Sequence, residues 1–274
     1  MDSKYSLEGE VSPPVFTPVV SEADIITTPL VEQSWQLFEN CRIAQALGVI
    51  QGPSGTGKTW ALKAIQKRFA QARMPGSISI VTCCQAAGPS SGVRSILLEM
   101  GLGGSVTSNR TVAGLHYLLK LAQREISQRG VKGILLDDAD SYAVDTIGGI
   151  VSLFNHLKET GHPVTILFAG VLPEERWIAQ LPSAATRTLH IERAEAMSAK
   201  LMAAVLKKMP PPMPDLVKAY QNGDKNAGKI LRLIHQNTGG VFRRVRFFVN
   251  LASEKTPSTL TLETAEAILG QMQN

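Results

Sequence analysis

The chain has 274 residues, enough for one large domain or for one domain with a small appendage. Apolar residues make up 44% and charged residues 19%, which is typical of a globular protein. The formal net charge of +5 permits nucleic-acid binding without requiring it. Three cysteines are too few for a disulfide framework, and no segment has the roughly 20 apolar residues of a membrane helix. We therefore expect a cytoplasmic protein with no membrane partner.

Residues 1–24 carry three prolines and no helical periodicity, so we expect a flexible N-terminal arm. From Thr28, apolar residues recur at spacings of three and four, which predicts a helix leading into a first strand at Leu47–Ile50. The further predicted strands are Ser77–Cys84, Lys132–Asp137, Pro163–Ala169 and Thr188–Ile191, and the helices between them cover Trp60–Phe69, Val93–Met100, Val112–Gln128 and Thr146–Glu159. This alternation predicts an α/β domain at 25–195 with a mostly parallel five-stranded sheet flanked by helices. Only helices are expected at 196–274, with a break at Pro210–Pro214.

A phosphate-binding loop follows the first predicted strand. The stretch Gly52-Pro53-Ser54-Gly55-Thr56-Gly57-Lys58-Thr59 matches G-x-x-x-x-G-K-[ST], and a helix is predicted from Trp60. Backbone N–H groups of such a loop surround a polyphosphate, the lysine contacts the β- and γ-phosphates, and the hydroxyl ligates Mg²⁺. We therefore expect residues 52–60 to bind a nucleoside triphosphate, with Lys58 on the phosphates and Thr59 on the metal.

A buried strand that ends in two carboxylates is the second chemical signal. Ile134-Leu135-Leu136 leads into Asp137 and Asp138. Phosphate-loop proteins hold magnesium at such a strand end. Asp137 is the expected metal partner, and Asp138 is the candidate that orients and deprotonates the attacking water. The alternative is that both residues are only the acidic start of a loop.

The spacing of GPSGTGKT, ILLDDAD, the strand VTILFAG and the closing helical segment resembles that of AAA+ ATPases. The absence of an N-K-x-D motif after the fourth strand disfavours a GTPase. The resemblance implies an AAA+ fold with a small C-terminal helical lid, and ATP and Mg²⁺ as ligands. It implies that Arg187, or Arg176 as a second candidate, reaches the γ-phosphate of a neighbouring subunit. In the segment that begins Thr238-Gly239-Gly240, it implies that Arg243 or Arg244 points at the nucleotide.

Two positions depart from the family pattern. The second acidic position is usually Glu, whereas here it is Asp138, one methylene shorter. The family carries a polar residue near the end of the fourth strand, whereas here Val171 stands there. Both departures predict slow or partner-stimulated hydrolysis, in which ATP serves mainly to hold an assembly together.

Within the family, the closest resemblance is to the ATPases that regulate DNA transposition, the MuB, TnsC and TniB proteins. The shared traits are a helix running straight into the phosphate loop, Gly88-Pro89 after the second strand, and a lid of the TGG-x-x-R-R type. The resemblance implies ATP-dependent homo-oligomers, as helical filaments on duplex DNA of any sequence, that select a target and recruit or stimulate a transposase. The implied DNA contacts are Arg94, Arg110 and Thr111, for which ordinary surface polarity is the alternative.

Other functions also fit an AAA+ ATPase. One alternative is a helicase-loader or initiator-type ATPase, of which a loader would form a discrete complex with a helicase and prefer single strands. A signalling or secretion-linked ATPase would bind only protein. ATP-dependent binding to duplex DNA of any sequence would distinguish the transposition regulator from the ATPase that binds only protein.

Overall fold

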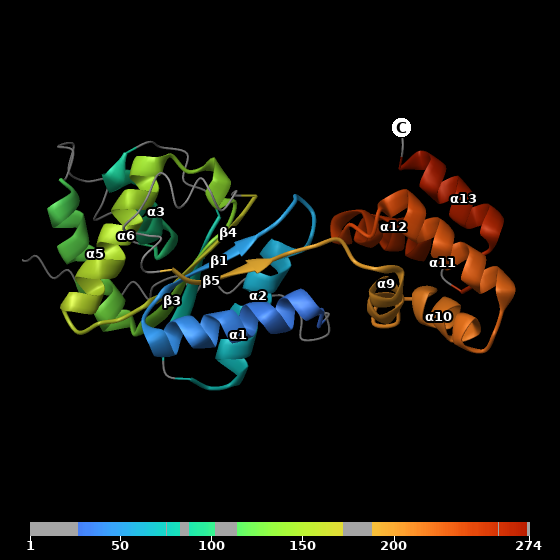
Figure 1. The fold of residues 1–274 in the computed structure, drawn as a ribbon, viewed down its shortest axis with the longest axis horizontal. Coiled ribbons are helices and arrows are strands. Elements are labelled where there is room, and N and C mark those ends of the chain that lie inside the picture. Colours follow the sequence, from blue (N-terminus) through green and yellow to red (C-terminus); the bar gives the residue numbers. More distant parts are fainter. Residues whose placement is uncertain are drawn as a thin grey trace, which may run out of the picture.

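The computed structural model describes residues 27–74, 76–82, 88–101, 114–171, 188–256 and 258–272, without the side chains of residues 188–192. The predicted arm at 1–24 lies outside these ranges, as do Arg110, Thr111, Arg176 and Arg187. The described chain forms an α/β body and a group of C-terminal helices that follow its last strand (Figure 1). No helix in these ranges combines the length and apolar content that a membrane crossing requires.

A five-stranded sheet forms the middle of the α/β body. Its strands are β1 (Leu47–Gln51), β2 (Ser77–Val81), β3 (Val131–Leu136), β4 (Thr165–Gly170) and β5 (Thr188–Arg193). The strand order is β2-β3-β4-β1-β5, and every neighbouring pair is parallel. Because parallel strands end at the same edge, the loops after β1, β3 and β4 meet there. These loops carry the phosphate loop, the acidic pair and Val171.

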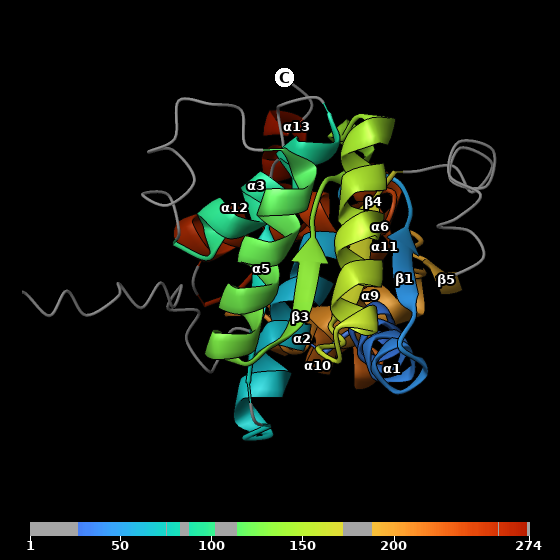
Figure 2. The ribbon, with the colours of Figure 1, turned by 90° about the vertical axis from the view of Figure 1, so that its left-hand side faces the viewer.

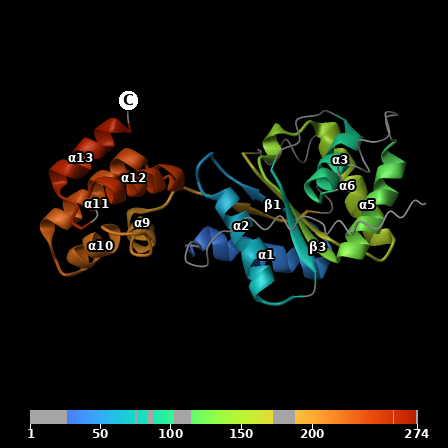
Figure 3. The ribbon, with the colours of Figure 1, turned by 180° about the vertical axis from the view of Figure 1, so that it is seen from behind.

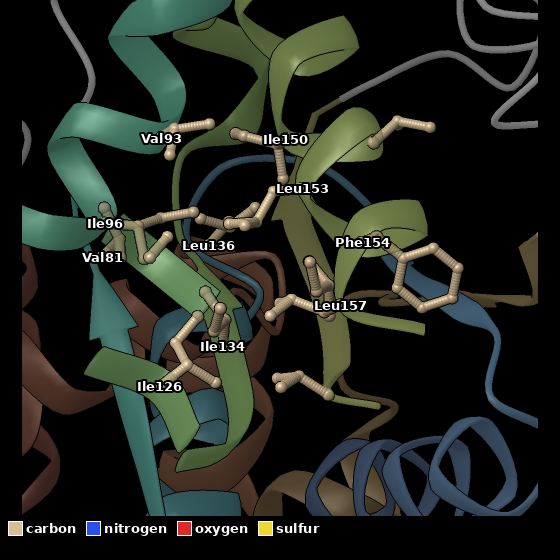
Figure 4. Packing of buried hydrophobic residues seen from close by; sticks show 14 of the residues in the cluster. Val81, Val93, Ile96, Ile126, Ile134, Leu136, Ile150, Leu153, Phe154 and Leu157 are labelled. Atoms are coloured by element: carbon tan, nitrogen blue, oxygen red, sulfur yellow. The ribbon is translucent and has the colours of Figure 1, made fainter. Parts of the chain in front are cut away.

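Helices cover both faces of this sheet. Helices α1 (Pro29–Ala44) and α2 (Lys58–Gln71) lie on one face, as seen from behind in Figure 3, and α3 (Pro89–Glu99), α5 (Leu115–Arg129) and α6 (Val144–Glu159) lie on the other (Figure 2). Strand side chains alternate between the two faces: Leu135 packs on the α1–α2 side, whereas Ile134 and Leu136 pack against α3 and α6 (Figure 4). The predicted α/β fold with a parallel sheet flanked by helices is confirmed.

Helix α3 begins four residues before the predicted start at Val93. Gly92 favours a loop in the sequence because glycine is a poor helix former. In the structure Pro89 opens the helix, a position where its missing N–H costs nothing. Gly92 is buried inside α3, which packs against α6. Tertiary packing therefore overrides the local preference.

The C-terminal helices have a hydrophobic core of their own. They are α9 (Ala199–Leu206), α10 (Met213–Gln221), α11 (Lys225–Thr238), α12 (Phe242–Lys255) and α13 (Leu262–Gln271), which we call the lid. Met202, Ile234 and Phe248 are fully buried in this core. The predicted break at Pro210–Pro214 is shorter than expected, because α10 begins inside it at Met213 and accommodates Pro214 in its first turn.

Candidate nucleotide-binding site

The phosphate loop joins β1 to α2. Gly55 (φ 84°) and Gly57 (φ 105°) both have left-handed backbone, which favours glycine, and α2 then begins at Lys58. Lys58 is buried, and its Nζ donates to the carbonyl oxygens of Gly52 (2.7 Å) and Pro53 (2.9 Å). The Lys58 ammonium therefore lies over the loop. When phosphates bind, its N–H groups would donate to phosphate oxygens in place of these two carbonyl oxygens.

A cavity of about 470 Å³ opens beside this loop. It is lined by the loop, the start of α2, the turn after β3, the end of β4 and the first turns of α12. Its lining includes Ser54, Gly55, Gly57, Lys58, Thr59, Trp60, Lys63, Asp138, Asp140, Val171, Phe242, Arg243, Arg246, Phe247 and Asn250. Sequence-predicted residues from three separate segments are thus brought to one cavity: Lys58 and Thr59, Asp138, and Arg243.

The two predicted carboxylates occupy different positions after β3. Asp137 is buried and accepts the backbone N–H of Asp138 at its Oδ1 (3.0 Å), whereas Asp138 is exposed and lines the cavity. Asp138 has φ 46°, a left-handed conformation that aspartate tolerates better than most residues. Ser141 closes the turn by donating its N–H (2.9 Å) and its hydroxyl (2.7 Å) to the Asp138 carbonyl oxygen.

Burial and neighbouring charges shift two pKa values here. Although Asp138 is exposed, partial desolvation at the cavity wall raises its pKa, and the charges of Asp137 and Asp140 raise it further. Burial lowers the pKa of Lys58, and the carboxylates of Asp140, Asp137 and Asp138 oppose that shift. A buried Lys58 ammonium beside carbonyl and carboxylate oxygens suits a polyanionic ligand. The negative charge of that ligand would favour the charged form of Lys58 further, as the carboxylates already do.

The donor set fits Mg²⁺ bound together with a nucleotide. Mg²⁺ in nucleotide sites takes one or two protein ligands, and phosphate oxygens and water complete its octahedron. The Thr59 hydroxyl, which lines the cavity, and the buried carboxylate of Asp137, next to Asp138 in sequence, are oxygen groups of this kind and remain the predicted ligands. Within the described ranges, the chain has no cluster of three or more His, Cys, Asp or Glu residues that could hold a metal without a nucleotide.

The lid contacts the phosphate loop through the start of α12 (Figure 1). The Arg243 backbone N–H donates to the Gly55 carbonyl oxygen (3.0 Å), and its guanidinium Nη1 lies 3.5 Å from the Ser54 hydroxyl. The Arg246 guanidinium lies 4.9 Å from the ring centre of Trp60. The sequence left Arg243 and Arg244 as alternatives, and of the two only Arg243 lines the cavity.

The predicted DNA contacts can be placed only in part. Arg94 lies on α3, half-buried, and its Nε atom is buried without a hydrogen-bond partner in the part of the chain that the structure describes. It does not line the cavity. Arg110 and Thr111 lie outside the described residues, as does the predicted arginine finger Arg187.

Sequence reasoning missed several lining residues. Arg246, Phe247 and Asn250 follow Arg243 at spacings of three, four and seven, which is the signal of one helix face. That signal becomes usable only once the start of α12 at Phe242 is known. Asp140 was also missed, although it stands two residues after Asp138.

Comparison with known proteins shows which family the chain and its fold resemble. A family model described as an AAA domain matches residues 42–178, half of the chain. The ORC2 protein of Aeropyrum pernix, solved as ADPNP–ADP complexes, is similar with a TM-score of 0.63 and 14% identity, over 88% of this chain and 66% of that one. Domain III of the Thermotoga maritima replication initiation protein DnaA has a TM-score of 0.56 and 16% identity, over 90% and 93%. The Aeropyrum pernix ORC1 protein in complex with DNA has a TM-score of 0.54 and 13% identity, over 93% and 68%.

The chain therefore spans about two thirds of the length of the two ORC proteins. At these identities the structural likenesses concern the fold. A search of the curated proteins gave no match. The family match covers the phosphate loop, the acidic turn after β3 and Val171, the segments that form the core side of the cavity. The chain belongs to the AAA domain family.

Proposed function

We propose that the protein is an initiator-type AAA+ ATPase that binds Mg·ATP between its phosphate loop and lid helix α12 and uses it to control assembly on duplex DNA. The observation that carries this proposal is the meeting of Lys58, Asp138 and Arg243 in one cavity, since these residues come from the loop, the turn after β3 and the lid. A nucleotide in this cavity would contact both the α/β body and the lid.

Different residues of the chain would bind the phosphates, hold the metal and activate the attacking water. Backbone N–H groups of the loop and the Lys58 ammonium would hold the phosphates, and Thr59 and Asp137 would hold Mg²⁺. The metal, when bound, neutralises charge on the phosphate oxygens. Asp138 would accept the proton of the attacking water. Because its carboxylate is one methylene shorter than glutamate, we expect slow turnover.

Assembly would complete the site. Arg187 is the proposed residue that reaches the γ-phosphate of a neighbouring copy, where a cation offsets charge that develops during transfer. Self-association would then depend on the triphosphate. DNA binding is supported by the net charge of +5 and by the likeness in fold to a protein solved in complex with DNA. Arg94, Arg110 and Thr111 are the proposed phosphate contacts.

The test is a binding series with duplex DNA of random sequence in the presence of ATP, ADP or a non-hydrolysable analogue. Fluorescence anisotropy measured against salt concentration reports phosphate-dominated binding, which weakens steeply as salt rises. We expect binding with the triphosphates and weak or absent binding with ADP. No binding with any nucleotide at low salt would leave the protein-only signalling ATPase as the better hypothesis.

Regulation of DNA transposition is the second candidate function. It is supported by the resemblance in sequence at Gly88-Pro89, which opens α3, and at Gly239-Gly240, which leads into α12. Electron microscopy separates it from the first: continuous ATP-dependent filaments on duplex DNA and stimulation of a transposase would favour the regulator. Discrete complexes on duplex DNA would favour the initiator, whereas a preference for single strands or a complex with a helicase would favour a loader.

A further inference from the structure

Asp140 lies in the three-residue helical turn that follows Asp138 and lines the same cavity. Its Oδ1 accepts the backbone N–H of Val171, the first residue after β4, over 2.9 Å. A carboxylate on the loop after β3 is thereby fastened to the end of the neighbouring strand. Since a carboxylate has acceptor positions on both oxygens, this bond leaves Asp140 able to accept further hydrogen bonds.

The backbone around this bond is tightly packed. A Cβ added at Gly170 would lie 2.5 Å from the Asp140 Oδ1 and 2.9 Å from its backbone N, so only glycine fits beside the turn. The Gly170 carbonyl oxygen in turn accepts the Gly52 N–H at the start of the phosphate loop (3.1 Å). Asp140, Gly170 and the phosphate loop therefore form one connected structure, and a shift of the turn would be transmitted to the loop.

Charge also joins Asp140 to the phosphate loop. Lys58 and Asp140 line the same cavity, so their opposite charges act across one space. Asp140 is half-buried, so solvent screens its charge less than that of an exposed carboxylate.

We propose that Asp140 is a positioning residue for ATP hydrolysis, an inference that rests on the function proposed above. Held by the Val171 N–H, its negative charge fixes the Lys58 ammonium and the turn that carries Asp138 in the geometry of attack. In that reaction a bond forms between the water oxygen and the γ-phosphorus, the bond from the γ-phosphorus to the bridging oxygen breaks, and the proton of the water passes to Asp138. The products are ADP and phosphate.

Two substitutions separate charge from hydrogen bonding. Asp140→Asn keeps an oxygen that can accept the Val171 N–H but removes the charge, whereas Asp140→Ala removes both. Asp145→Asn is the matched control, because Asp145 is exposed on α6 and does not line the cavity. For each chain we would measure ATP and ADP dissociation constants without Mg²⁺ by equilibrium binding, kcat with Mg²⁺, and the thermal unfolding midpoint.

For Asp140→Asn we expect kcat to fall about tenfold, less than the roughly 10²–10⁴-fold that a proton-transfer group itself contributes, because Asp140 acts through Asp138. The unfolding midpoint should stay close to that of the parent. ATP should bind about two- to fivefold more tightly relative to ADP, because a negative charge beside the phosphates is removed. Asp140→Ala should lose turnover equally and also unfold at a lower temperature. Asp145→Asn should match the parent in turnover and in affinity.

The proposal is overturned if Asp140→Asn keeps the parent kcat while Asp140→Ala loses it, since the hydrogen bond alone would then suffice. A parallel loss of affinity, turnover and unfolding midpoint in Asp140→Asn would likewise reduce Asp140 to a structural residue. Failure of the underlying function looks different: the parent chain itself would then bind no ATP or release no phosphate.

Discussion

Arg243 donates its backbone N–H to the carbonyl oxygen of Gly55 over 3.0 Å, so the first turn of the lid helix α12 rests on the phosphate loop. The N-termini of α2 and α12 both lie at this loop, and a helix N-terminus carries partial positive charge. Two helix ends and the side chains of Lys58 and Arg243 thus surround the place where phosphates would bind. The lid is therefore part of the site rather than an appendage to it.

Replacing Arg243 with alanine should weaken ATP binding about tenfold, the loss expected for one charge-assisted contact to a phosphate. Arg244→Ala is the matched control, because Arg244 is the next residue on α12 and does not line the cavity. Its dissociation constant for ATP should stay within about twofold of the parent. If both variants lose the same affinity for ATP, the positive charge of the helix end, and not the position of Arg243, determines ATP binding.

Lys58→Ala should lower ATP affinity by at least about a hundredfold, because the buried cation that faces the phosphates is removed. Nucleotide-dependent assembly, followed by analytical ultracentrifugation, should disappear with it. Lys132→Ala on β3 removes an exposed lysine and should leave both properties unchanged. Assembly that persists in Lys58→Ala would remove ATP from the mechanism.

Asp138 gives a prediction about pH. The pKa of Asp138 is raised in the folded chain, so folding disfavours its ionised form. The ionised carboxylate therefore lowers the free energy of unfolding at pH values above the raised pKa. This loss disappears as the pH falls to the ordinary aspartate range, where the carboxyl is protonated in both states. Asp138→Asn should therefore unfold at a higher temperature than the parent at pH 7, and the two midpoints should converge in acid. Because the base must be ionised, the acid limb of kcat should lie above the ordinary aspartate pKa. Identical midpoints at pH 7 would contradict this assignment.

Asp138→Glu tests the short carboxylate directly. If reach limits turnover, the longer side chain should raise kcat severalfold, measured by phosphate release. A small loss of stability should accompany the change, because φ is 46° at this position and glutamate tolerates left-handed backbone less well than aspartate. A fall in kcat would show that the site is matched to aspartate.

The contact between α3 and α6 offers a test of stability away from the cavity. A Cβ at Gly149 would lie 1.8 Å from the Pro89 carbonyl oxygen, so Gly149→Ala must push the two helices apart and should cost roughly 1–3 kcal/mol. A Cβ at Gly270 in α13 meets nothing within 4 Å, so Gly270→Ala should be neutral or stabilise by up to about 1 kcal/mol. Urea unfolding of both variants measures the change in the free energy of unfolding, which should fall for Gly149→Ala and stay equal or rise for Gly270→Ala.

Much of the fold could be predicted because its signals are local. Apolar runs marked the strands to within a few residues, and the glycines and Lys58 of the phosphate loop pointed to the candidate nucleotide site, where the structure has a cavity. Contacts between distant segments could not be predicted in the same way. The role proposed for Asp140 depends on a hydrogen bond from the N–H of Val171, which follows β4 and lies 31 residues away. The distinction between Arg243 and Arg244 depends on where α12 starts, and a shift of one residue on a helix turns a side chain by about 100°.

The separate hydrophobic core of the lid has a mechanical consequence. Since Met202, Ile234 and Phe248 stay buried within the lid itself, its rotation against the α/β body would expose little apolar surface. In the described ranges, the contacts that would have to break and re-form include those of Gly55, Ser54 and Trp60 with the start of α12. A nucleotide bound as proposed would touch both bodies, so its exchange would change the angle between them without unfolding either core.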